Sequence, residues 1–146
     1  MLRLRVIKLC HEFHKLTRID DMEDEIVYRE ESYLIIGICM EIHRVLGIGF
    51  SEIIYKDALE YELKEQKISY EREKEFRIKY KDYVLPRSFN ADFIVFDKII
   101  LEIKSCKCIA DEHVKQTLNY LAVTKLKLGL IINFGEISLK SKRILL

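Results

Sequence analysis

The chain has little of what usually divides, anchors or exports a protein. It contains one proline and five glycines in 146 residues, so no linker rich in these residues separates two domains. No apolar run approaches the roughly 18 residues that a membrane span requires. The basic N-terminal residues are not followed by a long apolar core and a small-residue cleavage site, which argues against a signal peptide. These absences predict one domain in the cytoplasm.

Cysteines are also scarce, and their spacing does not predict a metal site. Cys106 and Cys108 are too close in sequence for an ordinary zinc knuckle, and Cys10 and Cys39 lie far away without a matching pair. We therefore expect reduced thiols with a structural or incidental role.

The net charge of +1 does not by itself identify a nucleic-acid-binding protein. An apolar content of 49% and a charged content of 34% are those of an ordinary soluble domain. Basic residues are in excess over residues 64–81 and in the tail from Lys125 onward. A basic end can guide a polyanion, but a solvated surface of mixed charge is a slightly better interpretation of the same pattern.

Residues 1–21 fit a core poorly and are expected to form an N-terminal extension, while residues 22–146 form the domain. From Ser32, a predicted N-cap, apolar residues follow a helical period as far as Gly47. Ser51 is expected to cap a second helix. The predicted inner face of that helix comprises Ile54, Ala58, Leu59 and Leu63.

The hydrophobic period then changes to two, which predicts strands. The remaining elements are expected in this order: strands over 70–80, 84–96 (irregular around Pro86) and 99–105, a helix over 111–124, a strand over 128–134, and a strand or short helix over 137–145. This order predicts an α/β sheet with helices on both faces.

Two acids and a lysine lie within the apolar strands of one predicted hairpin. Asp92 is in the first strand, and Glu102 and Lys104 lie two residues apart on the next, so these two share a face. Buried charges are costly unless they are paired or bind a metal. Carboxylates bind Mg²⁺ through hard oxygens, and a nearby lysine can orient or deprotonate a water. The pattern is what a magnesium-dependent phosphodiesterase needs.

This site makes a geometric demand on the hairpin. Opposed residues of an antiparallel pair share a face, so a three-residue loop over residues 96–98 opposes Asp92 to Glu102. A two-residue turn at Asp97-Lys98 puts Asp92 on the wrong face unless a bulge intervenes. We expect the odd-length loop or a bulge. The alternative is that Glu102 and Lys104 line a solvent-facing side of the strand, as charged residues at strand ends often do.

The run Gly49-Phe50-Ser51-Glu52-Ile53-Ile54-Tyr55 resembles the Gly-x-x-Glu-x-x-Tyr signature of the GxxExxY protein family of bacteria and archaea. The resemblance covers residues 32–145 and continues through His43, Ala91-Asp92-Phe93, Glu102-Ile103-Lys104 and Ile131-Ile132-Asn133-Phe134-Gly135. It implies the PD-(D/E)xK nuclease superfamily, with a mixed sheet flanked by helices. Ala91 stands where the superfamily's name has a proline.

The resemblance implies roles for individual residues. Asp92, Glu102 and the Ile103 carbonyl would hold Mg²⁺ or Mn²⁺, supported by Glu52 on the first core helix, and Lys104 would activate water. Gln116 and Tyr120 look like the Gln-x-x-x-Tyr motif of the RecB-like branch and would orient the site.

The residues around this set keep other interpretations. Glu52 near a helix N-terminus can also be a simple favourable charge. Tyr55 is expected to pack, with its hydroxyl bonded to a neighbour. A lone histidine such as His43 is more often structural than metal-binding.

The sequence thus favours a metal-dependent nuclease acting on nucleic acid, with DNA favoured. The alternative is a non-catalytic module on the same fold that binds nucleic acid or protein. A third alternative is hydrolysis or binding of a non-DNA phosphoester by the same residues. The compact chain can act with a partner or as a homodimer.

Overall fold

The computed structural model describes residues 26–146 and assigns three helices and five strands within them. The predicted extension over residues 1–21 lies outside the described residues. The elements, in chain order, are α2 (Arg29–Leu46), α3 (Glu52–Glu65), β1 (Tyr70–Tyr80), β2 (Tyr83–Val95), β3 (Ile99–Lys104), α4 (Asp111–Thr124), β4 (Leu128–Asn133) and β5 (Lys140–Leu145). No helix in this part of the chain is long and apolar enough to cross a membrane.

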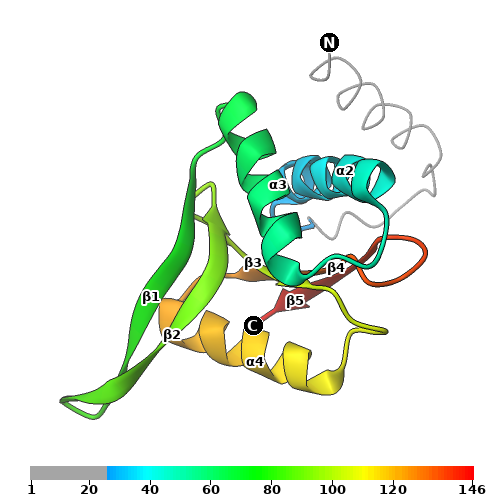
Figure 1. Ribbon diagram of the computed structural model, residues 1–146. Helices are drawn as coiled ribbons and strands as arrows, with labels where there is room; N and C mark the ends of the chain where they lie inside the picture. Colours follow the sequence, from blue (N-terminus) through cyan, green and yellow to red (C-terminus); the bar gives the residue numbers. More distant parts are fainter. Residues whose placement is uncertain (1–25) are drawn as a thin grey trace, which may run out of the picture.

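The five strands form one mixed sheet in which spatial order equals sequence order, β1-β2-β3-β4-β5 (Figure 1). Neighbouring strands are antiparallel except β3 and β4, which are parallel. A parallel pair needs a crossover, and α4 provides it. The predicted α/β architecture is confirmed.

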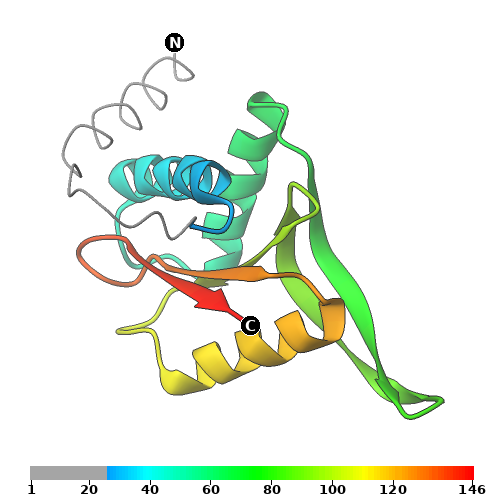
Figure 2. The same cartoon turned by 180° about the vertical axis from the view of Figure 1, so that it is seen from behind.

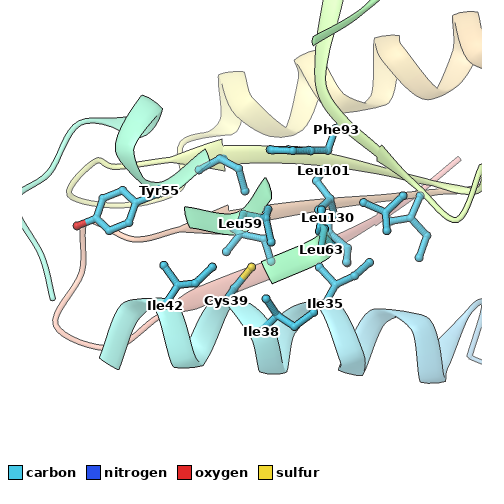
Figure 3. Close-up of a cluster of buried hydrophobic side chains, with 14 of the residues drawn as sticks. Ile35, Ile38, Cys39, Ile42, Tyr55, Leu59, Leu63, Phe93, Leu101 and Leu130 are labelled. Atoms are coloured by element: carbon cyan, nitrogen blue, oxygen red, sulfur yellow. The ribbon is translucent and has the colours of Figure 1, made fainter. Parts of the chain in front are cut away.

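The helices cover both faces of the sheet, with α2 and α3 on one face and α4 on the other (Figures 1 and 2). The larger core cluster joins buried residues of α2 and α3 to Phe93, Leu101 and Leu130 of the sheet (Figure 3). A smaller cluster lies under α4 and includes Ile100, Leu121 and Ile131. Alternate residues of the apolar strands therefore face different cores.

The start of α2 differs from the prediction. The helix begins at Arg29, and Ser32 is buried inside its first turn rather than at its N-cap. Its hydroxyl donates to the Tyr28 carbonyl at 2.6 Å and accepts from Arg143 of β5 at 2.7 Å. A partner more than a hundred residues away in sequence thus changed the role of this serine.

The inner face of α3 differs from the prediction at its first residue, whereas Leu59 and Leu63 are buried as predicted. Ile54 is exposed, and Tyr55 is fully buried in its place. The Tyr55 ring stacks on Phe134 with 4.4 Å between centroids, and its hydroxyl donates to the Gly47 carbonyl at 2.7 Å. The expected packing role of Tyr55 is confirmed.

The loop between β2 and β3 has the odd length that the site requires. Val95 pairs with Ile99, so Phe96, Asp97 and Lys98 form a three-residue loop. When this register is continued by one residue beyond the Phe93–Leu101 pair, Asp92 lies opposite Glu102. The predicted geometry of the hairpin is confirmed, and so is the irregularity around Pro86, where the register of β1 and β2 shifts.

Candidate functional site

The candidate site lies where β2 and β3 separate. Their last paired residues are Phe93 and Leu101, and beyond this point each strand offers a carboxylate to the other's backbone. The Ile103 N–H donates to Asp92 Oδ2 at 2.8 Å, and the Asp92 N–H approaches Glu102 Oε1 at 3.5 Å. Backbone N–H groups left without a ladder partner are thus satisfied by side chains. This exchange fixes both carboxylates in the opening between the strands.

Both acids are almost removed from solvent, with exposed fractions of 7% for Asp92 and 3% for Glu102. Burial raises the pKa of Glu102 to about 8, and the negative charge of Asp92 raises it further toward that value, while Lys104 and Lys56 oppose the shift. Two adjacent buried carboxylates resist ionising together unless a cation lies between or beside them. A positive charge close to the pair would therefore stabilise the ionised form of both carboxylates.

Lys56, on the second turn of α3, supplies one such positive charge. Its ammonium forms an ion pair with Asp92 Oδ1, and a second one with Glu73 Oε1 of β1 at 3.0 Å. Burial alone would lower the pKa of Lys56, but bonds to Asp92 and Glu73 outweigh it, so the pKa is raised. Glu73 has a positive φ of 50° directly across from Asp92, which distorts β1 at this point. A protein cation thus already lies on the buried aspartate.

Lys104 ends β3 on the same face as Glu102 and is half-buried. Among the described residues its ammonium has no ion-pair partner. The Lys104 carbonyl accepts from the Phe134 N–H of the β4 side at 2.8 Å. Because successive strand residues point their backbone groups to opposite neighbours, the Ile103 carbonyl points toward β2, as its N–H does.

Gln116 and Tyr120 come together on α4. Gln116 Nε2 donates to the Tyr120 hydroxyl at 2.6 Å. Burial and then the negative charge of Glu102 raise the pKa of Tyr120, so the phenol lies within electrostatic range of the carboxylates. Its ring stacks on Phe89 of β2 with 3.9 Å between centroids. The structure thus brings this predicted pair to the α4 side of the site.

Among the described residues, neither Glu52 nor His43 forms a hydrogen bond or ion pair with Asp92 or Glu102. In the part of the chain described, no three His, Cys, Asp or Glu side chains lie close enough to hold one metal ion. Glu52 and Lys104 both act on the Cys106 thiol, whose pKa burial raises, so the start of α3 and the end of β3 converge there. A metal-ligand role for Glu52 stays a prediction. His43 Nε2 bonds the Glu136 carbonyl at 2.9 Å, which is a structural role.

The turn after β3 is held by the end of β4. Asn133 Oδ1 accepts from the Cys106 N–H at 3.0 Å, and its Nδ2 donates to the Cys106 carbonyl at 2.9 Å. A Cβ on Gly135 would lie 2.4 Å from that same carbonyl oxygen, so only glycine fits there. Ser105 adds a bond from its hydroxyl to the Phe50 carbonyl at 2.7 Å, which ties the turn to the loop before α3.

Comparison with known protein families decides the relationship. The family model of the PD-(D/E)XK nuclease superfamily matches residues 29–144, which are most of the chain. The chain belongs to this superfamily. The crystal structure of SSO0001 is similar, with a TM-score of 0.52 and 18% identity over 99% of this chain and 78% of that one. At this identity the likeness shows the fold alone. A search of curated proteins finds no match.

PD-(D/E)XK nucleases typically use divalent metal ions, and the donor set here fits such an ion. Asp92 and Glu102 supply buried carboxylate oxygens, and Ile103 supplies a carbonyl that faces them. Hard oxygen donors of this kind suit Mg²⁺ and Mn²⁺. The raised pKa of Glu102 is also consistent with a cation site, because a bound cation would favour the ionised carboxylate.

Sequence reasoning missed Lys56, Glu73 and Asn133. Lys56 follows Glu52 by four residues and so shares its helix face, which was the one available signal. Glu73 carried no signal, because it stands among alternating charges on β1. Asn133 was part of the resembling run 131–135, but nothing in that run indicated that its amide holds the turn after Lys104.

Proposed function

We propose that this chain is a metal-dependent nuclease that hydrolyses phosphodiester bonds of nucleic acid, with DNA as the favoured substrate. The observation that carries the proposal is the pair of buried carboxylates from adjoining strands, beside a lysine ammonium with no ion-pair partner among residues 26–146. The Gly-x-x-Glu-x-x-Tyr run supports a finer assignment to the GxxExxY family, and residues 22–146 as its domain.

In this proposal Asp92, Glu102 and the Ile103 carbonyl would hold Mg²⁺ or Mn²⁺, and Glu52 would support them from the start of α3. The bound ion supplies a Lewis acid that lowers the pKa of water and neutralises charge on the phosphate. The other roles belong to side chains that the protein keeps in place without the ion.

Lys104 orients the attacking water or takes its proton, and its ammonium form balances charge on the scissile phosphate. Its half-buried position keeps it near Glu102 yet open to a substrate. The Gln116–Tyr120 pair presents an amide and a phenol on the α4 side, where they orient Lys104 or a phosphate oxygen. Positioning of this kind accounts for much of the rate gain in phosphoryl transfer.

The decisive experiment is cleavage of labelled single- and double-stranded DNA, and of RNA, with Mn²⁺ present. We expect metal-dependent cutting by the natural chain and a loss of at least about a hundredfold in Lys104→Ala, the range typical for a lost acid–base group. Lys107→Ala is the matched control, because Lys107 is an exposed lysine in the turn that follows β3.

Equal activity of Lys104→Ala and Lys107→Ala would contradict the role of Lys104. No cutting of any substrate by the natural chain, with circular dichroism showing that it is folded, would contradict the nuclease itself.

One observation favours the non-catalytic alternative. The ion pair of Lys56 with Asp92 gives the buried carboxylate a partner that needs no metal. A binding module on this fold would keep that pair and take up no Mn²⁺. Calorimetric titration with Mn²⁺ separates the two: a catalytic site binds the ion and loses it in Asp92→Asn.

A further inference from the structure

The β1–β2 hairpin extends well beyond the rest of the sheet and past α4, as both views show (Figures 1 and 2). We call its outer part, residues 77–88, the arm. Tyr80 pairs with Tyr83, so the arm ends in a two-residue turn at Lys81-Asp82. Only Ile78 and Leu85 of the arm are partly buried, and every other residue is exposed. An element that projects this far without a covering partner is available to a ligand.

The arm carries a concentrated positive charge. Arg77, Lys79, Lys81 and Arg87 are opposed by one acid, Asp82. None of the four forms an ion pair with any residue between 26 and 146. Basic residues nearer the base of β1 behave differently, since Arg72 and Lys74 are bound to carboxylates. Unpaired cations on a projecting ribbon suit a polyanion such as a nucleic acid.

The tip of the arm also presents aromatic surface. Tyr80 and Tyr83 are directly opposed, so they share a face, and their exposed fractions are 62% and 64%. Lys81 Nζ lies 5.5 Å from the Tyr80 ring centroid. Paired exposed tyrosines beside lysines offer rings that contact sugars and bases and hydroxyls that bond phosphates or base edges.

The base of the arm is joined to the candidate site by stacked rings. Phe76 and Phe89, an opposed pair at the base, stack with 5.3 Å between centroids. Phe89 stacks in turn on Tyr120, which lies within electrostatic range of Glu102. The aromatic face of the hairpin thus runs from the carboxylate pair toward the tip. A ligand held by the arm is directed toward the site.

We propose that the arm grips duplex DNA by entering its major groove, and that it thereby selects a double-stranded substrate; this rests on the proposed nuclease function of the site. The major groove, about 12 Å wide and about 8.5 Å deep, admits a two-stranded ribbon. From Phe76 to Tyr80 the arm reaches about 13 Å, at ~3.3 Å per residue. The tip tyrosines reach base edges, and the basic side chains behind them contact phosphates at the groove rim.

The test is binding of fluorescent duplex DNA by the full chain in EDTA, measured by anisotropy over a series of salt concentrations. The arm variant carries Arg77→Gln, Lys79→Gln and Arg87→Gln. The control variant carries Lys127→Gln, Lys140→Gln and Lys142→Gln, which are exposed residues with the same change of charge. We expect the arm variant to lose at least about tenfold in affinity, and its slope of log K against log salt to fall by about 2 to 3. The control changes neither by a comparable amount.

A second variant, Tyr80→Ala with Tyr83→Ala, is expected to reduce the preference for duplex over single-stranded DNA without changing the salt slope. Equal losses in the arm and control variants, unchanged duplex binding by the arm variant, or a natural chain that binds single strands as tightly as duplex would each overturn the proposal.

The same measurements separate this proposal from the nuclease. Binding that depends on the arm, without cutting in Mn²⁺, leaves the arm standing and removes the nuclease. If the arm variant binds duplex DNA as tightly as the natural chain and still cuts it, the nuclease stands and the role of the arm is removed.

Discussion

At the scale of the residue, Lys56 places a positive charge on Asp92, the carboxylate that we propose as a metal ligand. Its ammonium is bound to Asp92 and Glu73, with only 12% of the side chain exposed. If Asp92 holds the divalent ion of the proposed function, we expect that ion to compete with Lys56 for the Asp92 carboxylate. We therefore expect the lysine to stabilise the metal-free site and to lower its apparent affinity for the ion.

Lys56→Met is therefore expected to bind Mn²⁺ about tenfold more tightly than the natural chain, equivalent to about 1.4 kcal/mol. Without metal, the same variant loses about 2 kcal/mol of unfolding free energy, because Asp92 keeps a buried charge without its partner. Calorimetry and urea unfolding in EDTA measure the two effects. Lys64→Met, on an exposed lysine of the same helix, is the control. Weaker Mn²⁺ binding by Lys56→Met would refute the competition.

Glu102 makes the site dependent on pH. With a pKa of about 8 against an ordinary value of 4.5, its carboxyl is mostly protonated at neutral pH when no metal is bound. The groups facing it are Asp92 of β2, Lys104 of β3, Lys56 of α3 and Tyr120 of α4. Because a metal ligand must be ionised, we expect Mn²⁺ binding at the proposed site to release a proton, with an affinity that rises with pH up to about 8. Calorimetry in buffers of different ionisation enthalpy counts that proton.

The same shift affects the stability of the metal-free protein. A raised pKa in the folded state means that stability from Glu102 is fully present below pH 4.5 and is lost as pH rises toward about 8. Glu102→Gln removes this dependence, so its unfolding free energy relative to the natural chain is higher at pH 8 than at pH 4.5. Glu75→Gln, on an exposed residue of β1, should change nothing. A parallel pH profile for Glu102→Gln and the natural chain would contradict the shifted pKa.

At the scale of the element, the end of β4 controls the turn after β3. Gly135→Ala places a methyl group 2.4 Å from the Cys106 carbonyl, so the turn must move away from Asn133. We expect a loss of about 2 kcal/mol in unfolding free energy, typical of an overpacked site, and reduced cleavage, because Lys104 precedes the turn. Urea unfolding tests this, with Ile137→Ala in the same loop as control, since Ile137 is 93% exposed. Natural stability in Gly135→Ala would show that the turn adapts.

Local patterns predicted the elements well wherever one rule decided the outcome. The pairing of Asp92 with Glu102 was expected only through an odd-length loop or a bulge, and the structure selects the three-residue loop. The first residue of the inner face of α3 was predicted wrongly, because Ile54 and Tyr55 are neighbours and both are apolar. Only Phe134 and the Gly47 carbonyl, distant in sequence, select the tyrosine. The partner of Asp92 was missed for the same reason, since Lys56 reaches it through the packing of α3 on the sheet.

At the scale of the whole molecule, the sheet separates two hydrophobic cores of different size. The α2–α3 face holds the larger apolar core, whereas the α4 face carries a smaller core together with Gln116 and Tyr120. The opening between β2 and β3 lies between these layers, and the arm extends from the same two-stranded unit. One hairpin therefore supplies a carboxylate of the site and the projecting ribbon beside it.

The identity of spatial and sequence order in the sheet also bears on how the chain folds. Each strand pairs with the next one synthesised, so closing the sheet requires only short loops and one helical crossover, which favours rapid folding. Asp92 and Glu102 meet within a local hairpin and are expected to meet early. Lys56 arrives only when α3 docks on the sheet. We therefore expect the carboxylate pair to form before its protein cation is in place, so that the docking of α3 is the step at which Asp92 gains a partner charge.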